Sequence, residues 1–225
     1  VAGVHAALGI LLALLARKNS QQGQVIDVAL YEAMFNLMEG VVPEYDGAGA
    51  VREPAGSTLT GIVPTNTYLC RDGKHVVIGG NGDSIYARLM TAIGREDLAT
   101  DPALGSNAGR VEQQELIDAA IGGWTSAHKS AAVIATLEDA DVPVGPIYSI
   151  ADAFDDPHYQ ARGMFEEVNT PNGKLNIPAI LPKLSLTPGR TTWAGGAVGS
   201  HTDEVLLSAG FDKEALATLR ENGDI

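Results

Sequence analysis

Apolar and polar positions occur in blocks along the chain, and the first block is almost wholly apolar. Residues 1–16 read VAGVHAALGILLALLA, with His5 as the only polar side chain. This run is shorter than the about 20 residues that a transmembrane helix needs. A helix that is apolar on all sides is buried on several of them. We therefore expect a core helix over residues 1–16 whose beginning has been cut away, and no membrane span.

The next blocks are less regular. Residues 24–30 alternate between polar and β-branched or apolar side chains, which predicts a short strand or an extended entry into a helix over residues 31–38. Residues 43–67 are rich in Pro, Gly, Ser and Thr and show no sustained period. They are typical of a linker or of an extended segment that crosses between domains.

The middle of the chain predicts a small unit of strands and helices. Residues 66–70 and 75–78 are strand-like and flank Asp72-Gly73, a strong hairpin signal between β-rich runs. The glycine-rich sequence GGNG then leads into amphipathic helices. Their apolar faces are marked by Ile85, Leu89, Met90 and Ile93, by Leu116, Ile117, Ala120, Ile121 and Trp124, and by Val133, Ile134, Leu137 and Ala140.

The pattern breaks at residues 142–146, and a third section follows. Ser149 with Asp152 resembles a capping box, which predicts a short helix that ends at Asp156-Pro157. Residues 163–186 indicate a pair of strands, and Asp212 is a predicted N-cap of the last helix. Together these blocks predict a mixed α and β protein.

Charge and cysteine content exclude several classes of protein. The chain has 28 acidic and 15 basic residues, a formal net charge of −13. This balance argues against binding to nucleic acids, whose affinity for proteins comes largely from Lys and Arg, and against docking on anionic membranes. The single cysteine, Cys70, excludes an internal disulfide and favours a reducing compartment. We expect a cytoplasmic protein.

Motifs for catalysis are scarce. None of the five histidines forms an i, i+4 pair, so we expect no metal site, and the chain has no Gly-x-Ser-x-Gly nucleophile elbow. The most unusual feature is Gly79-Gly80-Asn81-Gly82, between a predicted strand and a predicted helix. Glycines in that position can hold an anion at the helix N-terminus. They are also typical of a tight turn without a ligand, which the pattern alone favours.

Several short blocks occur in an order that is specific to one family. They are residues 2–14 (AGVHAALGILLAL), 23–34, 79–82, 142–147 (VPVGPI), 162–164 (RGM) and 199–206 (GSHTDEVL). From end to end, this ordered set resembles the C-terminal portion of the class III CoA-transferases, the CaiB/BaiF family that includes formyl-CoA:oxalate CoA-transferase.

The resemblance implies a mixed α/β fold with a Rossmann-like large domain and a smaller α+β domain. Residues 1–60 would be the last helices of the large domain and a linker. Residues 61–150 would form the small domain with its glycine loop, and residues 151–225 a segment that returns to the large domain. The family also implies an interlocked homodimer, which suits the extended connections between these parts.

The resemblance also implies the reaction, in which CoA passes between an acyl-CoA thioester and a small carboxylic acid. A catalytic Asp attacks the thioester and forms a covalent aspartyl intermediate, with coenzyme A as a substrate and without a metal. The family places that Asp two residues before the position matched by Val1. We therefore expect the nucleophile upstream of this chain, and the fragment alone to be inactive.

The same resemblance assigns roles to the glycine loop. Gly79 and Gly80 match positions that line the active site and shield the aspartyl intermediate. Exposed backbone N–H groups there could stabilise an oxyanion and exclude water. We expect Asn81, Gly82 and Asp83 to contact the substrate. Asn81 and Asp83 depart from the more glycine-rich loop of formyl-CoA transferase, so the loop does not indicate which carboxylic acid is the substrate.

Two alternatives differ in their chemistry. The α-methylacyl-CoA racemases share the fold and carry a catalytic Glu in the corresponding loop, where this chain has Gly82. That difference favours a transferase over a racemase. A non-catalytic interaction module is the other alternative, because the chain has no convincing nucleophile of its own. The resemblance favours acyl-CoA, a carboxylic acid and a second copy of the chain as partners.

Overall fold

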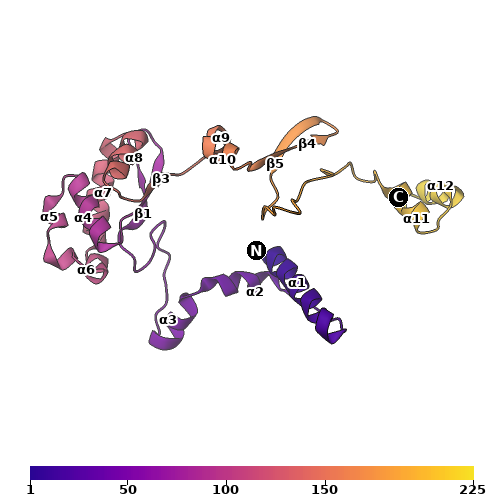
Figure 1. Ribbon diagram of the computed structural model, residues 1–225, viewed down its shortest axis with the longest axis horizontal. Helices are drawn as coiled ribbons and strands as arrows, with labels where there is room; N and C mark the ends of the chain where they lie inside the picture. The colour runs from indigo at the N-terminus through magenta and orange to yellow at the C-terminus, as the bar shows by residue number, and fades with distance from the viewer. The chain divides into compact units, whose positions relative to one another are not determined.

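The structure is a computed structural model that describes all residues from 1 to 225. The chain forms two compact units, residues 1–147 and residues 148–225. Both helices and strands occur along it, which confirms the mixed α/β class (Figure 1). The finer division into domains at residues 1–60, 61–150 and 151–225 stays a prediction.

The first unit begins with helices. They are α1 (Ala2–Ser20), α2 (Leu30–Phe35), the 3-10 turn η1 (Asn36–Met38) and α3 (Val41–Ala48). The helix predicted over residues 1–16 is confirmed and continues to Ser20, with Arg17 and Lys18 in its last turn. No helix of the structure combines the length and the apolar character needed to cross a lipid bilayer.

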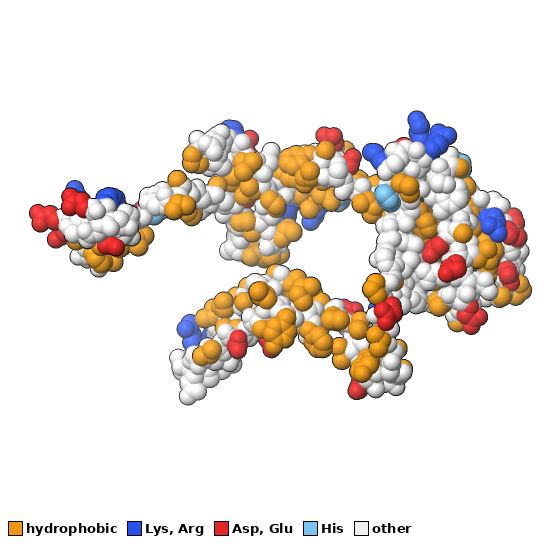
Figure 2. Space-filling model, turned by 180° about the vertical axis from the view of Figure 1, so that it is seen from behind, with side chains coloured by type: hydrophobic (Ala, Val, Ile, Leu, Met, Phe, Trp, Pro, Cys, Tyr) orange, Lys and Arg blue, Asp and Glu red, His pale blue; other side chains and the backbone are white.

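Helix α1 is not covered within this chain, so the expectation of a core helix stays a prediction. None of its residues is buried, and Leu8, Leu11, Leu12 and Leu15 are between 55% and 59% exposed. Figure 2 shows hydrophobic side chains over much of the segment that contains α1 to α3, except at its polar end. Helix α2 is the element that packs most closely on α1. With 6 residues against 19, α2 is too short to cover α1.

Two predictions for the segments beside these helices need correction. Residues 21–29 have no regular structure, so the strand reading of residues 24–30 is wrong, and Ala29 enters α2 with an extended backbone. The irregular segment predicted at residues 43–67 begins inside α3 and ends in a strand. Pro43 is tolerated in α3 because it lies in the first turn, where its missing N–H has no intrahelical partner in any case.

A three-stranded antiparallel sheet follows, in the order β1-β2-β3. The strands are β1 (Thr65–Leu69), β2 (His75–Gly79) and β3 (Val144–Pro146). The predicted hairpin is confirmed: β1 pairs with β2, and Gly73 has the positive φ of 78° that its turn requires. Within the break predicted at residues 142–146, Val144–Pro146 form an edge strand that pairs with β2, and the first unit ends directly afterwards at Ile147.

Helices pack around this sheet and build the core of the first unit (Figure 1). They are α4 (Asp83–Ala92), α5 (Glu96–Ala99), η2 (Pro102–Leu104), α6 (Asn107–Glu112), α7 (Gln114–Ala127) and α8 (Ser130–Asp139). The three amphipathic helices predicted from the apolar spacing are confirmed as α4, α7 and α8. Their buried side chains join β1 and β2 in one cluster that spans Val63 to Val142, including Ile78, Leu89, Ile117, Ile121, Val133 and Leu137.

The second unit contains α9 (Ile150–Asp155), α10 (Pro157–Ala161), β4 (Phe165–Thr170), β5 (Gly173–Pro178), α11 (Thr202–Ser208) and α12 (Lys213–Asn222). The capping box of Ser149 and Asp152 and the predicted strand pair are confirmed. Asp212 caps α12 as predicted, and its Oδ1 accepts a hydrogen bond from the N–H of Ala215 at 2.8 Å.

Candidate functional site

The glycine loop, residues Gly79–Asp83, joins the end of β2 to the start of α4. The N–H of Gly79 donates to the carbonyl of Pro143 at 3.0 Å, and the N–H of Gly80 donates to the carbonyl of Pro64 at 2.9 Å. Both groups are therefore used within the fold. In this conformation neither is free to stabilise an oxyanion, and the expected role of Gly79 and Gly80 at the active site stays a prediction.

Gly80 is fixed by close packing as well as by its hydrogen bond. A Cβ at residue 80 would lie 2.5 Å from Leu89 Cδ2 and 3.0 Å from Pro64 Cγ. A Cβ at residue 79 would meet its nearest neighbour, Pro143 Cβ, at 3.9 Å, an ordinary contact. The loop therefore needs glycine at position 80 on steric grounds, and position 79 has room for a methyl group.

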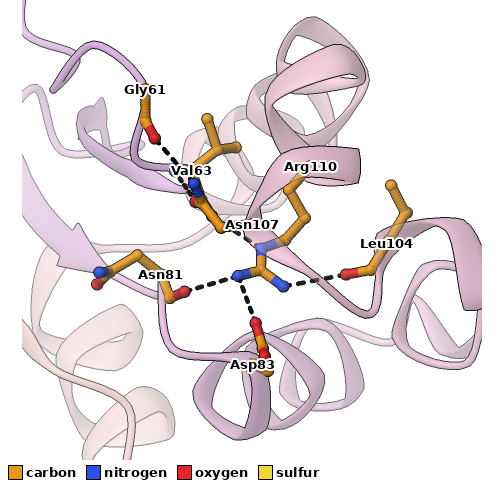
Figure 3. A network of polar contacts seen from close by, with 7 residues as sticks. All are labelled: Gly61, Val63, Asn81, Asp83, Leu104, Asn107 and Arg110. Atoms are coloured by element: carbon orange, nitrogen blue, oxygen red, sulfur yellow. Dashed lines mark hydrogen bonds and ion pairs between the residues drawn. The ribbon is translucent and has the colours of Figure 1, made fainter.

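Arg110 of α6 holds the glycine loop from its buried side (Figure 3). One nitrogen, Nη2, donates to the carbonyl of Asn81 at 2.7 Å and to Oδ1 of Asp83 at 2.8 Å. Nε donates to the carbonyl of Val63 at 2.9 Å, and Nη1 to that of Leu104 at 3.0 Å. The side chain is 0% exposed, so this cation depends on these acceptors in place of water.

A second residue of α6 fastens the segment that precedes the sheet. Asn107 Oδ1 accepts from the N–H of Val63 at 3.0 Å, and its Nδ2 donates to the carbonyl of Gly61 at 2.8 Å (Figure 3). Asn107 and Arg110 are three residues apart and so lie on one face of the helix. Together they tie α6 to residues 61–63, and Arg110 ties that segment to the glycine loop.

The ring of Tyr86 in α4 completes the surroundings of the guanidinium. Arg110 Cζ lies 4.9 Å from the ring centroid, within the range of a cation–π interaction. Burial raises the pKa of Tyr86 to about 12, and the positive charge of Arg110 acts against that rise. The Tyr86 ring therefore contributes packing and a cation–π contact beside the buried guanidinium.

The residues expected to contact the substrate occupy different environments. The Asn81 side chain is exposed, Gly82 is half-buried, and the Asp83 side chain is 66% exposed. The loop therefore presents two polar side chains to solvent, while the carbonyl of Asn81 and one oxygen of Asp83 are bound to Arg110. Contact between these side chains and a substrate stays a prediction.

Sequence reasoning missed Arg110 and Asn107. The available signal was their i, i+3 spacing in the segment Asn107–Glu112, which was not predicted as a helix. An Arg is rarely expected in a core, because it is almost never fully buried unless it is paired. No group of three or more His, Cys, Asp or Glu side chains in the structure is placed to hold a metal ion.

Known proteins resemble the chain along most of its length. It is 38% identical over 222 residues to succinyl-CoA–D-citramalate CoA-transferase of Chloroflexus aurantiacus, covering 98% of this chain and 55% of that protein. It is 33% identical over 209 residues to succinyl-CoA:mesaconate CoA-transferase of Haloarcula marismortui, covering 92% and 52%. The chain thus spans about half the length of the curated relatives it matches.

A solved structure resembles the chain in its fold as well. The crystal structure of a CaiB/BaiF family protein from Brucella suis matches with a TM-score of 0.73 and 26% identity, over 92% of this chain and 53% of that one. The sequence pattern of CoA-transferase family III matches residues 1–202. With this match over most of its 225 residues, the chain belongs to CoA-transferase family III.

Proposed function

We propose that the protein containing this chain transfers CoA from an acyl-CoA thioester, with succinyl-CoA as the donor, to a small dicarboxylic acid. The observation that carries the proposal is the 38% identity, over 222 residues, to a transferase named for succinyl-CoA and D-citramalate. Further relatives are named for succinyl-CoA with L-malate or with mesaconate, at 35% and 33% identity. The shared donor and the similar acceptors in these names define the expected substrates.

The proposed reaction runs through a carboxylate nucleophile, an Asp expected upstream of Val1. Its carboxylate attacks the thioester carbonyl, the CoA thiolate leaves, and a mixed anhydride forms. The thiolate then attacks the aspartyl carbonyl, giving an aspartyl-CoA thioester and releasing the donor acid. The acceptor carboxylate displaces CoA in the same way, and attack of the thiolate on the acceptor's carbonyl yields the new acyl-CoA and restores the Asp.

Within this proposal, the glycine loop of the chain covers the reacting centre and keeps water away from it. Mixed anhydrides and thioesters hydrolyse in water, so a transferase has to exclude water while they exist. Gly79 and Gly80 would form the part of the loop nearest the intermediate. Asn81, Gly82 and Asp83 would face the acid substrate, where the Asn81 amide can donate a hydrogen bond to a carboxylate.

The proposal includes a homodimer in which the chains are interlocked. The exposed leucines of α1, together with other exposed apolar side chains of α2 and α3, form an apolar surface for the rest of the full-length protein and for a second copy to cover (Figure 2). An enzyme that uses acyl-CoA substrates also implies a cytoplasmic location. Analytical ultracentrifugation of the full-length protein should give twice the mass of one full-length polypeptide, and a monomer would contradict this part of the proposal.

The activity is tested on the full-length protein with succinyl-CoA and separate acceptors: citramalate, malate, mesaconate and oxalate. Liquid chromatography should show formation of the acceptor's CoA thioester together with free succinate. Incubation with succinyl-CoA alone should leave CoA on one Asp, detected by peptide mass spectrometry. No transfer to any acid, alongside racemisation of a 2-methylacyl-CoA, would replace the transferase by a racemase.

A further inference from the structure

We infer that Arg110 is a positioning residue that holds the glycine loop in place through Asp83, and so limits the hydrolysis of the covalent intermediate. This inference rests on the proposed CoA transfer and deepens it. It concerns a side chain that is fully buried and therefore acts through the loop, without touching the substrate.

The geometry joins three separate parts of the chain at one guanidinium. Nη2 binds two points of the glycine loop, the carbonyl of Asn81 and the carboxylate of Asp83. The other two nitrogens bind Val63 and Leu104, which lie outside the loop. Because a planar guanidinium presents its donors in fixed directions, the loop is held at a set position relative to the core.

Burial divides the contacts of Arg110 into those that belong to the core and one that water can replace, the contact with Asp83. The carbonyl acceptors of Val63 and Leu104 belong to the folded core and keep Arg110 in place. The Asp83 carboxylate is 66% exposed, so water competes for it, whereas the guanidinium is 0% exposed. Losing the contact with Asp83 therefore removes one of the two points at which Arg110 holds the loop and leaves the Asn81 carbonyl as the other, without removing Arg110 from the core.

Comparing Asp83→Ala with Asp83→Asn in the full-length protein tests this mechanism. With succinyl-CoA and an acceptor, release of free CoA and formation of the acceptor thioester are measured in the same reaction. For Asp83→Ala we expect hydrolysis itself to become faster, so that the ratio of hydrolysis to transfer rises about tenfold, the size of effect that one hydrogen bond to a charged group supplies. Asp83→Asn should raise the ratio less, because the amide oxygen still accepts from Arg110.

A matched control is available in the neighbouring helix α5. Asp97 pairs with Arg95 at 2.6 Å and is 61% exposed, much like Asp83. Asp97→Ala removes a similarly exposed carboxylate that makes no hydrogen bond to the glycine loop, and it should leave the ratio unchanged. Arg110→Lys should raise the ratio, since a single ammonium group cannot reproduce the forked contacts.

Two results would overturn the inference. An unchanged ratio in a folded Asp83→Ala variant would show that the contact does not control water access. A fall in transfer without a rise in hydrolysis would show that Asp83 acts as a substrate contact only. Both results leave transfer by the unmodified protein intact, so they are distinguishable from failure of the proposed function, in which the unmodified protein transfers CoA to no acid.

Discussion

Leu89 packs so closely beneath Gly80 that a methyl group on residue 80 would lie 2.5 Å from Leu89 Cδ2. Leu89 is 0% exposed and the neighbouring Pro64 is a rigid ring, so neither side chain can move aside freely. Gly80→Ala should therefore lower the free energy of unfolding by about 1–3 kcal/mol, the usual cost of an overpacked core. Urea unfolding followed by circular dichroism measures it.

Gly79→Ala is the matched control for this substitution, because its nearest neighbour would lie 3.9 Å away. We expect a change in the free energy of unfolding of less than about 1 kcal/mol. Equal losses in the two variants would contradict the packing argument for Gly80.

At Gly109 the neighbouring atoms are backbone atoms, and they lie even closer than the side chains beside Gly80. A Cβ there would lie 1.8 Å from the carbonyl oxygen of Ala103, in the turn that precedes α6. Gly109→Ala should cost about 3 kcal/mol or more, because either the turn or the helix that carries Arg110 has to shift. Gly122→Ala in α7 meets nothing within 4 Å and should stabilise the protein by about 0.5–1 kcal/mol. Thermal unfolding of both variants provides the comparison.

Replacing Arg110 by Met should destabilise the small sheet and its helices strongly. The substitution removes the donors from the buried carbonyls of Val63 and Leu104 and from the part-buried carbonyl of Asn81. Buried acceptors without partners cost about 1–3 kcal/mol each, so we expect a loss of roughly 3 kcal/mol or more. Arg95→Met breaks an exposed pair and should cost about 0–1 kcal/mol. Similar losses in urea unfolding would refute the importance of the buried network.

Asp72 makes stability depend on pH at the acidic end. Its Oδ2 accepts hydrogen bonds from the N–H and the Oγ of Ser130, the first residue of α8, at 3.1 and 2.8 Å. Burial acts to raise the pKa of this carboxyl, but the hydrogen bonds outweigh burial and hold it below its ordinary value of 3.8. A carboxylate with a lowered pKa stabilises the fold above its unfolded-state pKa, and this contribution is lost as the pH falls through the folded-state value.

Because the stabilising contribution of the Asp72 charge is lost in acid, removing that charge should weaken the pH dependence of stability. Between pH 7 and pH 3, the melting temperature of Asp72→Asn should fall less than that of the unmodified protein. Asp101→Asn serves as a control because Asp101 caps the short turn η2 instead of α8. Parallel pH curves for the unmodified protein and Asp72→Asn would exclude the proposed contribution of Asp72.

The elements that could be predicted from the sequence are those fixed by neighbouring residues. Asp72-Gly73 forms the hairpin turn, Ser149 and Asp152 form a capping box, and Asp212 caps the last helix. In each case the donor and the acceptor, or the turn and its positive φ, lie within a few residues of one another. The amphipathic helices α4, α7 and α8 were predictable for the same reason, because a helical face repeats within one segment.

The features that could not be predicted depend on distant residues. Arg110 meets Val63 across 47 residues and Asn81 across 29 residues, so no local pattern announces its burial. The engagement of the Gly79 and Gly80 N–H groups by Pro143 and Pro64 is equally non-local. The family resemblance identified the loop, but the contacts that hold it became visible only in three dimensions.

The buried cluster is drawn from one continuous stretch of chain, Val63 to Val142, whereas α1 has no buried residue. Hydrogen exchange should therefore divide the first unit into two classes of amide. Those of Val76 and Ile78 exchange only when the whole cluster opens, at a rate independent of protein concentration. The amides of α1 should exchange more slowly when another protein surface covers its leucines, so their exchange rate reports on association.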